Sequence, residues 1–384
     1  MRISIDRGLS LLLVILLAGG CSGLKLGRAV RTGPQDWNTL GGSSLRTNRS
    51  AAVLHPPLRE ILQYNAQSGI LATPLVRDSV LLISTLQGEL HAVNLRNGAR
   101  FGYIVLDGSV IGTPVWSNGN VCIPLASGTE TLVSYSLFGG TRNWSAKLGS
   151  IESSLALFNQ RLYVTTIGGF LHCLNVQDGT EVWKYRTDVD EKRKPIRSSP
   201  ATNGEIVVFG CDDGGIYAVE CATGSRRWKI QTQRSVFASP VIVQDRVFIG
   251  SLDGAMYCLD VRTGSLVWKF DTKSPIYGAA SSDGRRVFVG TADGTCFALE
   301  IDGGSVAWRF KARSVINCAP LVTRDIVFVS SLDKNLYALS VETGKETWRF
   351  AAEGRIKVSP VAWNGFLIMV SEDKKVTVLK EEKQ

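Results

Sequence analysis

Short hydrophobic runs alternate with turn-forming residues along most of the chain. Residues 235–270 show the pattern most clearly, with four runs rich in β-branched and aromatic residues separated by turns such as Asp253-Gly254 and Thr263-Gly264. Runs of this kind joined by tight turns are typical of antiparallel strands, and Asp-Gly readily supplies the positive φ that a tight hairpin needs. This stretch therefore predicts a small sheet of four antiparallel strands.

The same unit recurs eight times. A small residue followed by proline precedes the first strand of most units, at intervals of 40, 41, 45, 40, 40, 40 and 40 residues, so only the interval from Leu155 to Pro200 contains an insertion. Tandem four-stranded units of this length are typical of a propeller. We therefore predict an all-β fold, an eight-bladed β-propeller of four-stranded antiparallel blades. The eight landmarks are Pro74, Pro114, Leu155, Pro200, Pro240, Ala280, Pro320 and Pro360.

A tryptophan stands four residues after a glycine in six of the units. Because these tryptophans share one slot of the repeat, we interpret them as wedges between neighbouring sheets rather than as a stacking site for a cofactor. They are Trp144, Trp183, Trp228, Trp268, Trp308 and Trp348.

The last unit ends after three strands, and a spare hydrophobic strand precedes the first unit at residues 58–64. Leu62 stands 12 residues before Pro74, the offset that separates Trp228 from Pro240. We expect this N-terminal strand to complete the last blade and close the ring, which leaves no open sheet at either end.

The N-terminal residues have the features of an export signal. Residues 1–20 have two arginines followed by a short apolar run, and Ala18-Gly19-Gly20-Cys21 resembles the bacterial lipobox. We predict a lipoprotein signal peptide over 1–20, lipidation of Cys21, a lipidated tether and lead-in over 21–57, and the propeller over 58–384. The alternative is an ordinary signal peptide and an unmodified thiol. We expect Trp37 to pack against the propeller.

The net charge and the histidine and cysteine residues indicate which partners and which kinds of site to expect. The net charge of +9 favours acidic lipids or acidic protein loops as partners, whereas an exported chain would rarely meet nucleic acid.

His91 and His172 occupy a slot that holds Tyr or Phe in other units, so we interpret them as aromatic substitutes. The seven cysteines after Cys21 are interpreted as buried free thiols. We predict no metal ligands and no catalytic residues.

The segment 258–268 matches the pattern Ala-x-Asp-x-x-Thr-Gly-x-x-x-Trp, with cysteine in the first position. It resembles the pyrroloquinoline-quinone (PQQ) repeat family, and the resemblance extends over residues 58–379. The family includes PQQ-dependent dehydrogenases as well as non-catalytic propellers. Because the chain has no adjacent cysteine pair, no long lid insertions and no haem signature, we predict a protein that is not an enzyme and binds no cofactor. A quinoprotein dehydrogenase or a small-ligand-binding propeller is the alternative.

A propeller of this length behind a lipobox is similar to the lipoprotein subunits of the outer-membrane β-barrel assembly machinery. That resemblance implies a monomeric periplasmic scaffold, lipid-anchored to the outer membrane, with the β-barrel insertase and unfolded outer-membrane proteins as partners. Inner-membrane anchoring remains open.

The insertion before Pro200 is the candidate partner-binding loop. Its residues are Lys192, Arg193, Lys194, Ile196 and Arg197, and Pro195 stiffens it. The loop should lie on the same face of the ring as the Asp213-Gly214 turn. A solvated loop without a partner is the alternative.

Overall fold

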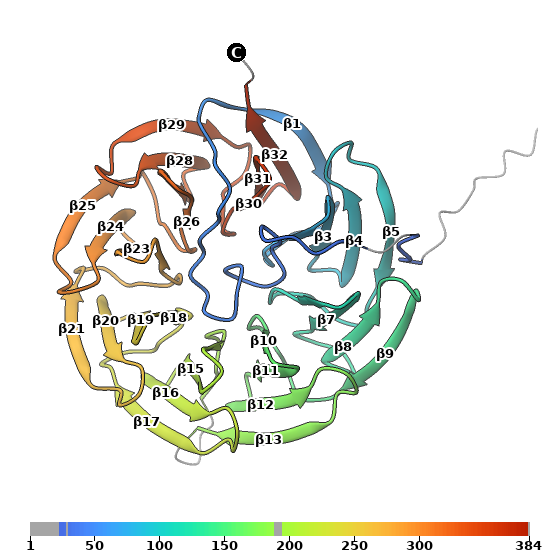
Figure 1. Ribbon diagram of the computed structural model, residues 1–384, viewed down its shortest axis with the longest axis horizontal. Coiled ribbons are helices and arrows are strands. Elements are labelled where there is room, and N and C mark those ends of the chain that lie inside the picture. Colours follow the sequence, from blue (N-terminus) through green and yellow to red (C-terminus); the bar gives the residue numbers. More distant parts are fainter. Residues whose placement is uncertain (1–22, 28–29, 188–193, 383–384) are drawn as a thin grey trace, which may run out of the picture.

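Eight four-stranded antiparallel sheets surround a central axis (Figure 1). The computed structural model describes residues 23–27, 30–187 and 194–382. The predicted architecture is confirmed. The first four blades comprise β2 (Leu75–Arg77), β3 (Val80–Ser84), β4 (Glu89–Asn94) and β5 (Arg100–Val105); β6 (Val115–Ser117), β7 (Asn120–Pro124), β8 (Leu132–Ser136) and β9 (Thr141–Ala146); β10 (Ala156–Phe158), β11 (Arg161–Thr165), β12 (Phe170–Asn175) and β13 (Glu181–Arg186); and β14 (Ala201–Thr202), β15 (Ile206–Gly210), β16 (Gly215–Glu220) and β17 (Arg226–Gln231).

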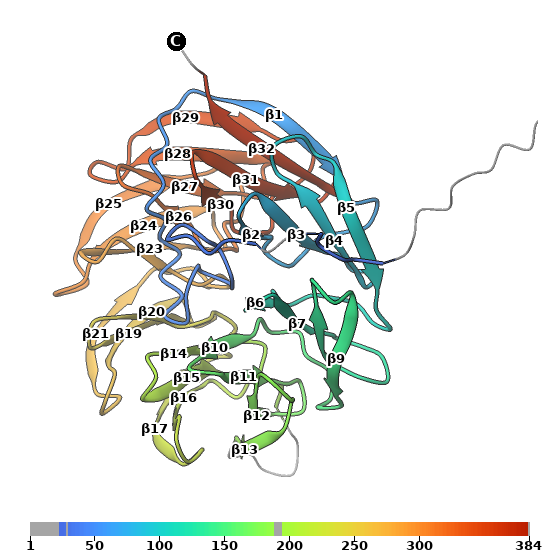
Figure 2. The same cartoon turned by 45° about the vertical axis from the view of Figure 1, so that its right-hand side comes forward.

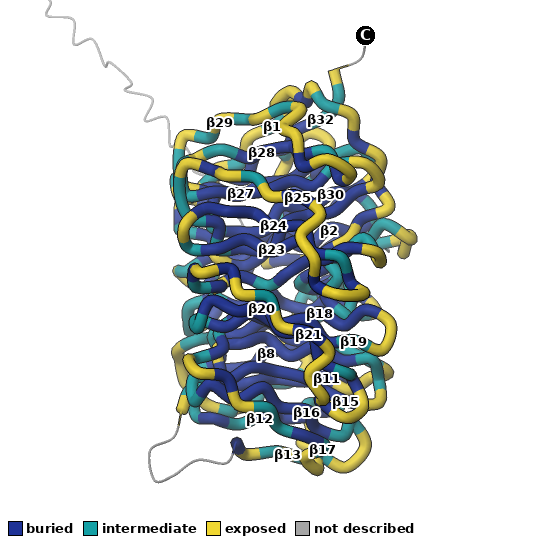
Figure 3. The backbone as a smooth tube through the Cα atoms, turned by 90° about the vertical axis from the view of Figure 1, so that its left-hand side faces the viewer, coloured by how far each residue is buried: buried dark blue, intermediate teal, exposed yellow. Residues whose placement is uncertain are grey.

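The remaining blades repeat this arrangement. They comprise β18 (Val241–Val243), β19 (Arg246–Gly250), β20 (Ala255–Asp260) and β21 (Leu266–Asp271); β22 (Ser281–Ser282), β23 (Arg286–Gly290), β24 (Thr295–Glu300) and β25 (Val306–Lys311); β26 (Leu321–Val322), β27 (Ile326–Ser330), β28 (Asn335–Ser340) and β29 (Glu346–Ala351); and β30 (Val361–Trp363), β31 (Phe366–Ser371), β32 (Lys375–Glu381) and β1 (Leu58–Asn65). In each blade the second and third strands are largely buried, whereas the fourth forms the exposed outer wall (Figure 3). Among the described residues no helix is long and apolar enough to cross a membrane.

The N-terminal strand closes the ring as predicted. β1 pairs with β32 in antiparallel register, with Leu58 opposite Glu381 and Tyr64 opposite Val376. Leu62 also takes the expected wedge position, since a Cβ atom on Gly98 of the first blade would lie 2.6 Å from the Leu62 side chain. The two ends of the chain therefore complete one sheet.

Five of the six tryptophans donate a hydrogen bond to the following blade, as wedges between neighbouring sheets would. Trp268 of the fifth blade donates its indole N–H to Ile301 O of the sixth blade at 2.8 Å. Its ring covers Gly304, where a Cβ atom would lie 2.7 Å away. In five of the six Gly-x-x-x-Trp motifs the glycine thus accommodates the tryptophan of the preceding blade, and the exception is Gly140, which lies against the N-terminal residues Leu24 and Lys25. The same indole bond joins Trp144 to Val176, Trp183 to Cys221, Trp228 to Val261 and Trp308 to Val341.

The first blade has Gly102 at the wedge position, opposite Ala92. Residues 23–27, called here the N-terminal strap, fill this gap between the first and second blades. A Cβ atom on Gly102 would lie 2.6 Å from Gly23 O, and Leu24 is fully buried beside it. A side chain from the N-terminus therefore replaces the missing tryptophan.

Residues 30–57, the lead-in, cross one end of the ring near its axis (Figures 1 and 2). Trp37 is buried and exchanges two backbone hydrogen bonds with Val76, which confirms that it packs against the propeller. The lead-in bonds to the innermost strand of every blade or to the residue that enters it. The other contacts are Asn38 with Trp116, Thr39 with Leu155, Ser44 with Thr202, Leu45 with Ile242, Thr47 with Ser282, Asn48 with Val322 and Ser50 with Ala362.

Two faces of the ring follow from this topology. The lead-in face carries the turns between the first and second strands of the blades. Two of these turns bond to the lead-in: Arg31 N donates to Asp78 Oδ2, between β2 and β3, at 3.1 Å, and Asn364 N, between β30 and β31, donates to Gln35 Oε1 at 2.8 Å. The opposite end, called here the loop face, carries the connections from each outer strand to the next blade. Residues 194–197, the described part of the insertion before Pro200, belong to the loop face.

Candidate functional site: the two mouths of the central channel

The lead-in closes its mouth of the channel with two buried polar side chains. Arg46 donates to Pro200 O at 2.6 Å and to Leu155 O and Ser154 O at 3.1 and 3.3 Å, which are blade carbonyls with no neighbouring strand on that side. Burial lowers the pKa of Arg46 to about 9, so the guanidinium is charged at neutral pH. Asn48 donates to Pro320 O on the other side of the axis. These bonds satisfy polar groups that would otherwise be buried without partners.

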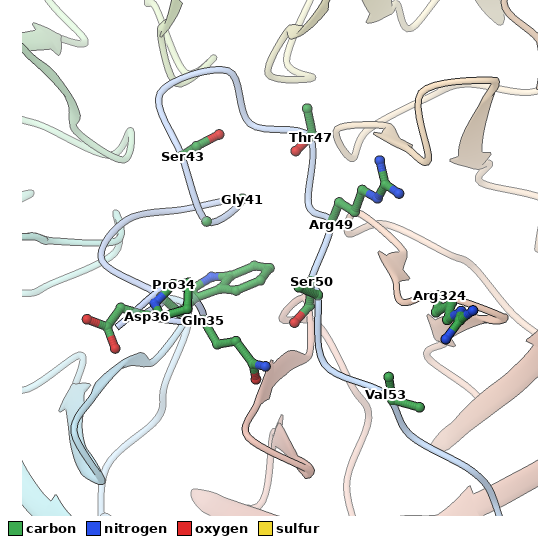
Figure 4. A pocket seen from close by; sticks show the side chains of 13 residues that line it. Pro34, Gln35, Asp36, Gly41, Ser43, Thr47, Arg49, Ser50, Val53 and Arg324 are labelled. Atoms are coloured by element: carbon green, nitrogen blue, oxygen red, sulfur yellow. The ribbon is translucent and has the colours of Figure 1, made fainter. Parts of the chain in front are cut away.

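A hollow of about 580 Å³ remains on the outer side of the lead-in (Figure 4). Trp37, Arg49, Ser50 and Arg324 are among its lining residues. The indole N–H of Trp37 is buried and has no hydrogen-bond partner. The charged residues that line this hollow are two cations, Arg49 and Arg324, and one carboxylate, Asp36.

Hydroxyl groups link adjacent blades around the channel wall. Thr73 N donates to Thr113 Oγ1, Thr113 N to Ser154 Oγ, Ser154 N to Ser199 Oγ and Ser199 N to Ser239 Oγ, at 2.8 to 3.0 Å. These residues are the small side chains that directly precede the landmarks, which are prolines except for Leu155. Their bonds explain the landmark: the inner edges of the blades approach closely, so only a short side chain fits.

The loop face has a ring of eight residues of differing chemistry, called here the mouth ring. Each stands three positions before a landmark, in the connection that enters a blade, and each is at least partly exposed. The residue at this slot varies from apolar to charged, whereas the residue directly before it in the sequence is always a buried Ile or Val. The mouth ring consists of Leu71, Ile111, Glu152, Arg197, Phe237, Tyr277, Asn317 and Lys357.

Arg197 contacts its two neighbours in the mouth ring, Glu152 and Phe237. The Arg197 guanidinium lies 5.5 Å from the centre of the Phe237 ring and 3.5 Å from Glu152 Oε2. Arg197 also forms an ion pair with Asp212 from the same blade. Burial raises the pKa of Asp212, and Arg197 opposes this shift. The cluster therefore offers an aromatic face, a cation and a carboxylate on one side of the mouth.

The predicted partner-binding loop is only partly described. Cys21, Lys192 and Arg193 lie outside the described residues, and Lys194 is exposed. Ile196 is fully buried and donates its backbone N–H to Thr166 O at 3.2 Å, so its side chain is not available to a partner here. The position four before the landmark holds Ile70, Val110, Ile151, Ile196, Val236, Ile276, Ile316 and Ile356, all buried. Aligning the eight repeats would have placed Ile196 in the core.

The loop lies where expected relative to the next blade, since Asp212 N donates to Pro195 O at 3.0 Å. Of the predicted residues, Lys194 and Arg197 remain exposed at the mouth. Glu152 and Phe237 were not predicted as neighbours of Arg197. The variable slot three residues before each landmark was the available signal.

The histidines and cysteines lie in the blades. His91 bonds to Tyr64 at 2.7 Å and His172 to Glu181 at 2.6 Å, within aromatic surroundings, as the interpretation as aromatic substitutes requires. The seven cysteines of the described part are free, and burial raises the pKa of thiols such as Cys258 to about 12. Such thiols carry almost no thiolate at neutral pH.

Comparison with known proteins identifies the family. A profile described as "Outer membrane protein assembly factor BamB" matches residues 29–185, 106–309 and 252–383. The chain belongs to this family. The BamB of Xanthomonas campestris is 25% identical over 108 residues, which is 25% of this chain and 27% of that protein. The alignment thus spans about a quarter of that relative.

Two further comparisons bear on the range of functions. The crystal structure of BamB from Moraxella catarrhalis superposes with a TM-score of 0.73 at 18% identity, covering 84% of this chain and all of that one, which shows the shared fold. The quinohemoprotein alcohol dehydrogenase ADH-IIG of Pseudomonas putida is 27% identical over 99 residues, 23% of this chain and 14% of that enzyme. Both branches of the predicted resemblance are therefore present among the relatives.

The alternative function, a PQQ-dependent dehydrogenase, implies a site for a metal ion and the quinone, and the side chains of the described residues do not fit such a site. Within residues 23–27, 30–187 and 194–382, no group of three or more His, Cys, Asp or Glu side chains could hold a metal ion. No two cysteines are adjacent in the sequence to form a vicinal disulfide. We derive no reaction step through such a group.

Proposed function

We propose that the protein is a non-catalytic propeller scaffold of outer-membrane protein assembly. It works in the periplasm, anchored to the outer membrane through a lipid on Cys21. The observation that carries the proposal is the family match, which extends through all eight blades. Rigid rings with variable loops suit protein binding, because the scaffold holds side chains of different chemistry in fixed positions.

The partner-binding surface is the loop-face mouth around Arg197, together with Lys192, Arg193 and Lys194. Its partners are the periplasmic part of a β-barrel insertase and unfolded outer-membrane proteins. Phe237 and Tyr277 supply aromatic contact area, and Arg197 supplies a cation, which are the residue types that contribute most to binding energy at protein interfaces. The exposed outer strands could additionally accept an extended segment by strand addition.

Crosslinking in intact cells tests this proposal. A photo-reactive residue at Tyr277, which is 43% exposed, should capture a β-barrel insertase. Reversal of Lys192, Arg193 and Lys194 to Glu should reduce the captured amount at least severalfold without changing the urea midpoint of unfolding. Lys345→Glu, in an exposed turn of the lead-in face, is the matched charge control. Equal capture by the triple variant and the control would refute the role of the loop.

A PQQ-dependent dehydrogenase is the second candidate, favoured by the similarity to the Pseudomonas putida enzyme. Its test is dye reduction by the purified protein with quinone, calcium and an alcohol. Turnover above that of the heat-denatured protein would overturn the assignment as a non-catalytic scaffold.

A further inference from the structure

The N-terminal strap is held firmly by the propeller. Leu24 is fully buried and Leu26 is 5% exposed. Tyr135 donates its hydroxyl to Leu24 O at 3.0 Å, and Leu26 N donates to Leu137 O at 2.7 Å. The strap therefore belongs to the seam between the first two blades and is part of the folded ring.

Only Ser22 separates Cys21 from this strap. Two residues of extended chain span at most about 7 Å. A lipid on Cys21 is therefore held near the outer wall of the first blade. An anchor on a flexible linker of tens of residues would leave the orientation of the ring free, whereas this one restricts it.

The outer wall beside the strap carries exposed apolar side chains. Gly102 of β5 faces the strap. Because successive side chains of a strand point to opposite faces of the sheet, Phe101 and Val105 lie on the face of β5 that points away from the strap. They are 43% and 64% exposed. Ile61 on β1, the outer strand of the neighbouring blade, is 40% exposed.

Cationic side chains accompany these apolar residues. Lys25 is an exposed residue of the strap itself, and Arg100 begins β5. Arg96 and Ile61 line one hollow of about 580 Å³ at the seam between the last and first blades. Apolar residues flanked by cations suit the boundary between acyl chains and anionic headgroups.

We infer that the outer edge formed by Lys25, Ile61, Arg96, Phe101 and Val105, called here the membrane edge, lies against the lipid surface. This inference rests on the lipid anchor of the proposed function. The axis of the ring then runs parallel to the membrane plane, so neither mouth of the channel faces the membrane. The anchor leaves the mouth ring and the lead-in face accessible to protein partners.

Photo-crosslinking to lipid tests this arrangement. A benzoylphenylalanine is placed at Phe101 or Val105 in the full-length protein, and lipid adducts are measured by mass spectrometry after irradiation of intact cells. The matched controls are Leu266 and Val267 on β21, the outer strand of the fifth blade, which are 55% and 41% exposed. We expect at least fivefold more adduct at the membrane edge. Equal yields, or protein adducts in place of lipid at Phe101 and Val105, would overturn the inference.

A longer linker tests the role of the short connection. Ten Gly and Ser residues inserted between Ser22 and Gly23 add about 17 Å of root-mean-square reach. Adducts at Phe101 and Val105 should then fall toward the control level, while the urea midpoint stays unchanged. Adduct yields that do not fall would overturn the claim that the strap holds this edge to the membrane.

The same samples separate this inference from the proposed function. Mass spectrometry of the N-terminal peptide reports acylation of Cys21. An acylated protein with equal adduct yields refutes the membrane edge alone. A protein that lacks acyl chains on Cys21 refutes the proposed anchor and, with it, the membrane edge.

Discussion

Truncation of a single tryptophan wedge should destabilise the ring by an amount that the structure allows us to estimate. Trp268 is 9% exposed and lies between the fifth and sixth blades. A buried tryptophan removes about 200 Å² from water, worth about 5 kcal/mol at 25 cal/mol per Å². Since cavities relax in part, we expect Trp268→Ala to cost about 3 to 5 kcal/mol.

A second substitution separates packing from hydrogen bonding. Trp268→Phe keeps an aromatic ring over Gly304 but removes the N–H that bonds to Ile301 O. The lost bond should cost about 1 kcal/mol, and the smaller ring somewhat more. The phenylalanine variant should therefore be clearly more stable than the alanine variant.

Urea unfolding followed by far-ultraviolet circular dichroism measures both variants, after refolding from urea has been shown to be reversible. Val267→Ala, on the same strand with a 41% exposed side chain, is the matched control and should change stability by less than about 0.5 kcal/mol. A cost for Trp268→Ala within about 1 kcal/mol of this control would refute the wedge role.

Three further predictions follow from buried contacts. Leu24→Ala should cost about 2 to 5 kcal/mol in urea unfolding, because Leu24 fills the gap that Gly102 leaves; no loss would contradict the role of the strap. Cys221 is the one half-buried thiol of the described part, so it should react with iodoacetamide before the six buried ones, as peptide mass mapping can show. Burial alone would raise the pKa of Asp333, but hydrogen bonds from Tyr337 and from the backbone N–H groups of Asn335 and Arg313 hold it below its ordinary value. The carboxylate therefore stabilises the fold above about pH 4 and loses this effect as the pH falls through its folded-state pKa. Asp333→Asn should flatten the pH dependence of unfolding below about pH 4, and an unchanged slope would contradict this account.

The blades were predictable from the sequence because their signals are local and repeated. Hydrophobic runs, Asp-Gly turns and the tryptophan slot recur at a nearly constant interval, so each unit confirms the others. The closing strand was predictable for the same reason, since Leu62 keeps the spacing of the wedge. Eight copies of one pattern average out the ambiguity of any single strand.

The candidate site was predicted only in part. Pro195 lies beside Asp212 at the turn where the loop was expected, but Ile196 is buried because it occupies an apolar slot common to all eight repeats. The contacts of Arg197 with Glu152, Asp212 and Phe237 join three blades. Residues so far apart in the chain meet only because the ring places their loops side by side.

The sequence by itself determined the number of blades, their strands, the wedges and the closure of the ring, because these depend on periodic patterns within the chain. The tertiary structure decided the course of the lead-in across the axis, the buried contacts of Arg46 and the replacement of a missing tryptophan by Leu24. These contacts use backbone carbonyls and a gap left by a glycine, and neither has a side-chain pattern of its own. Such features become visible only when distant segments are brought together.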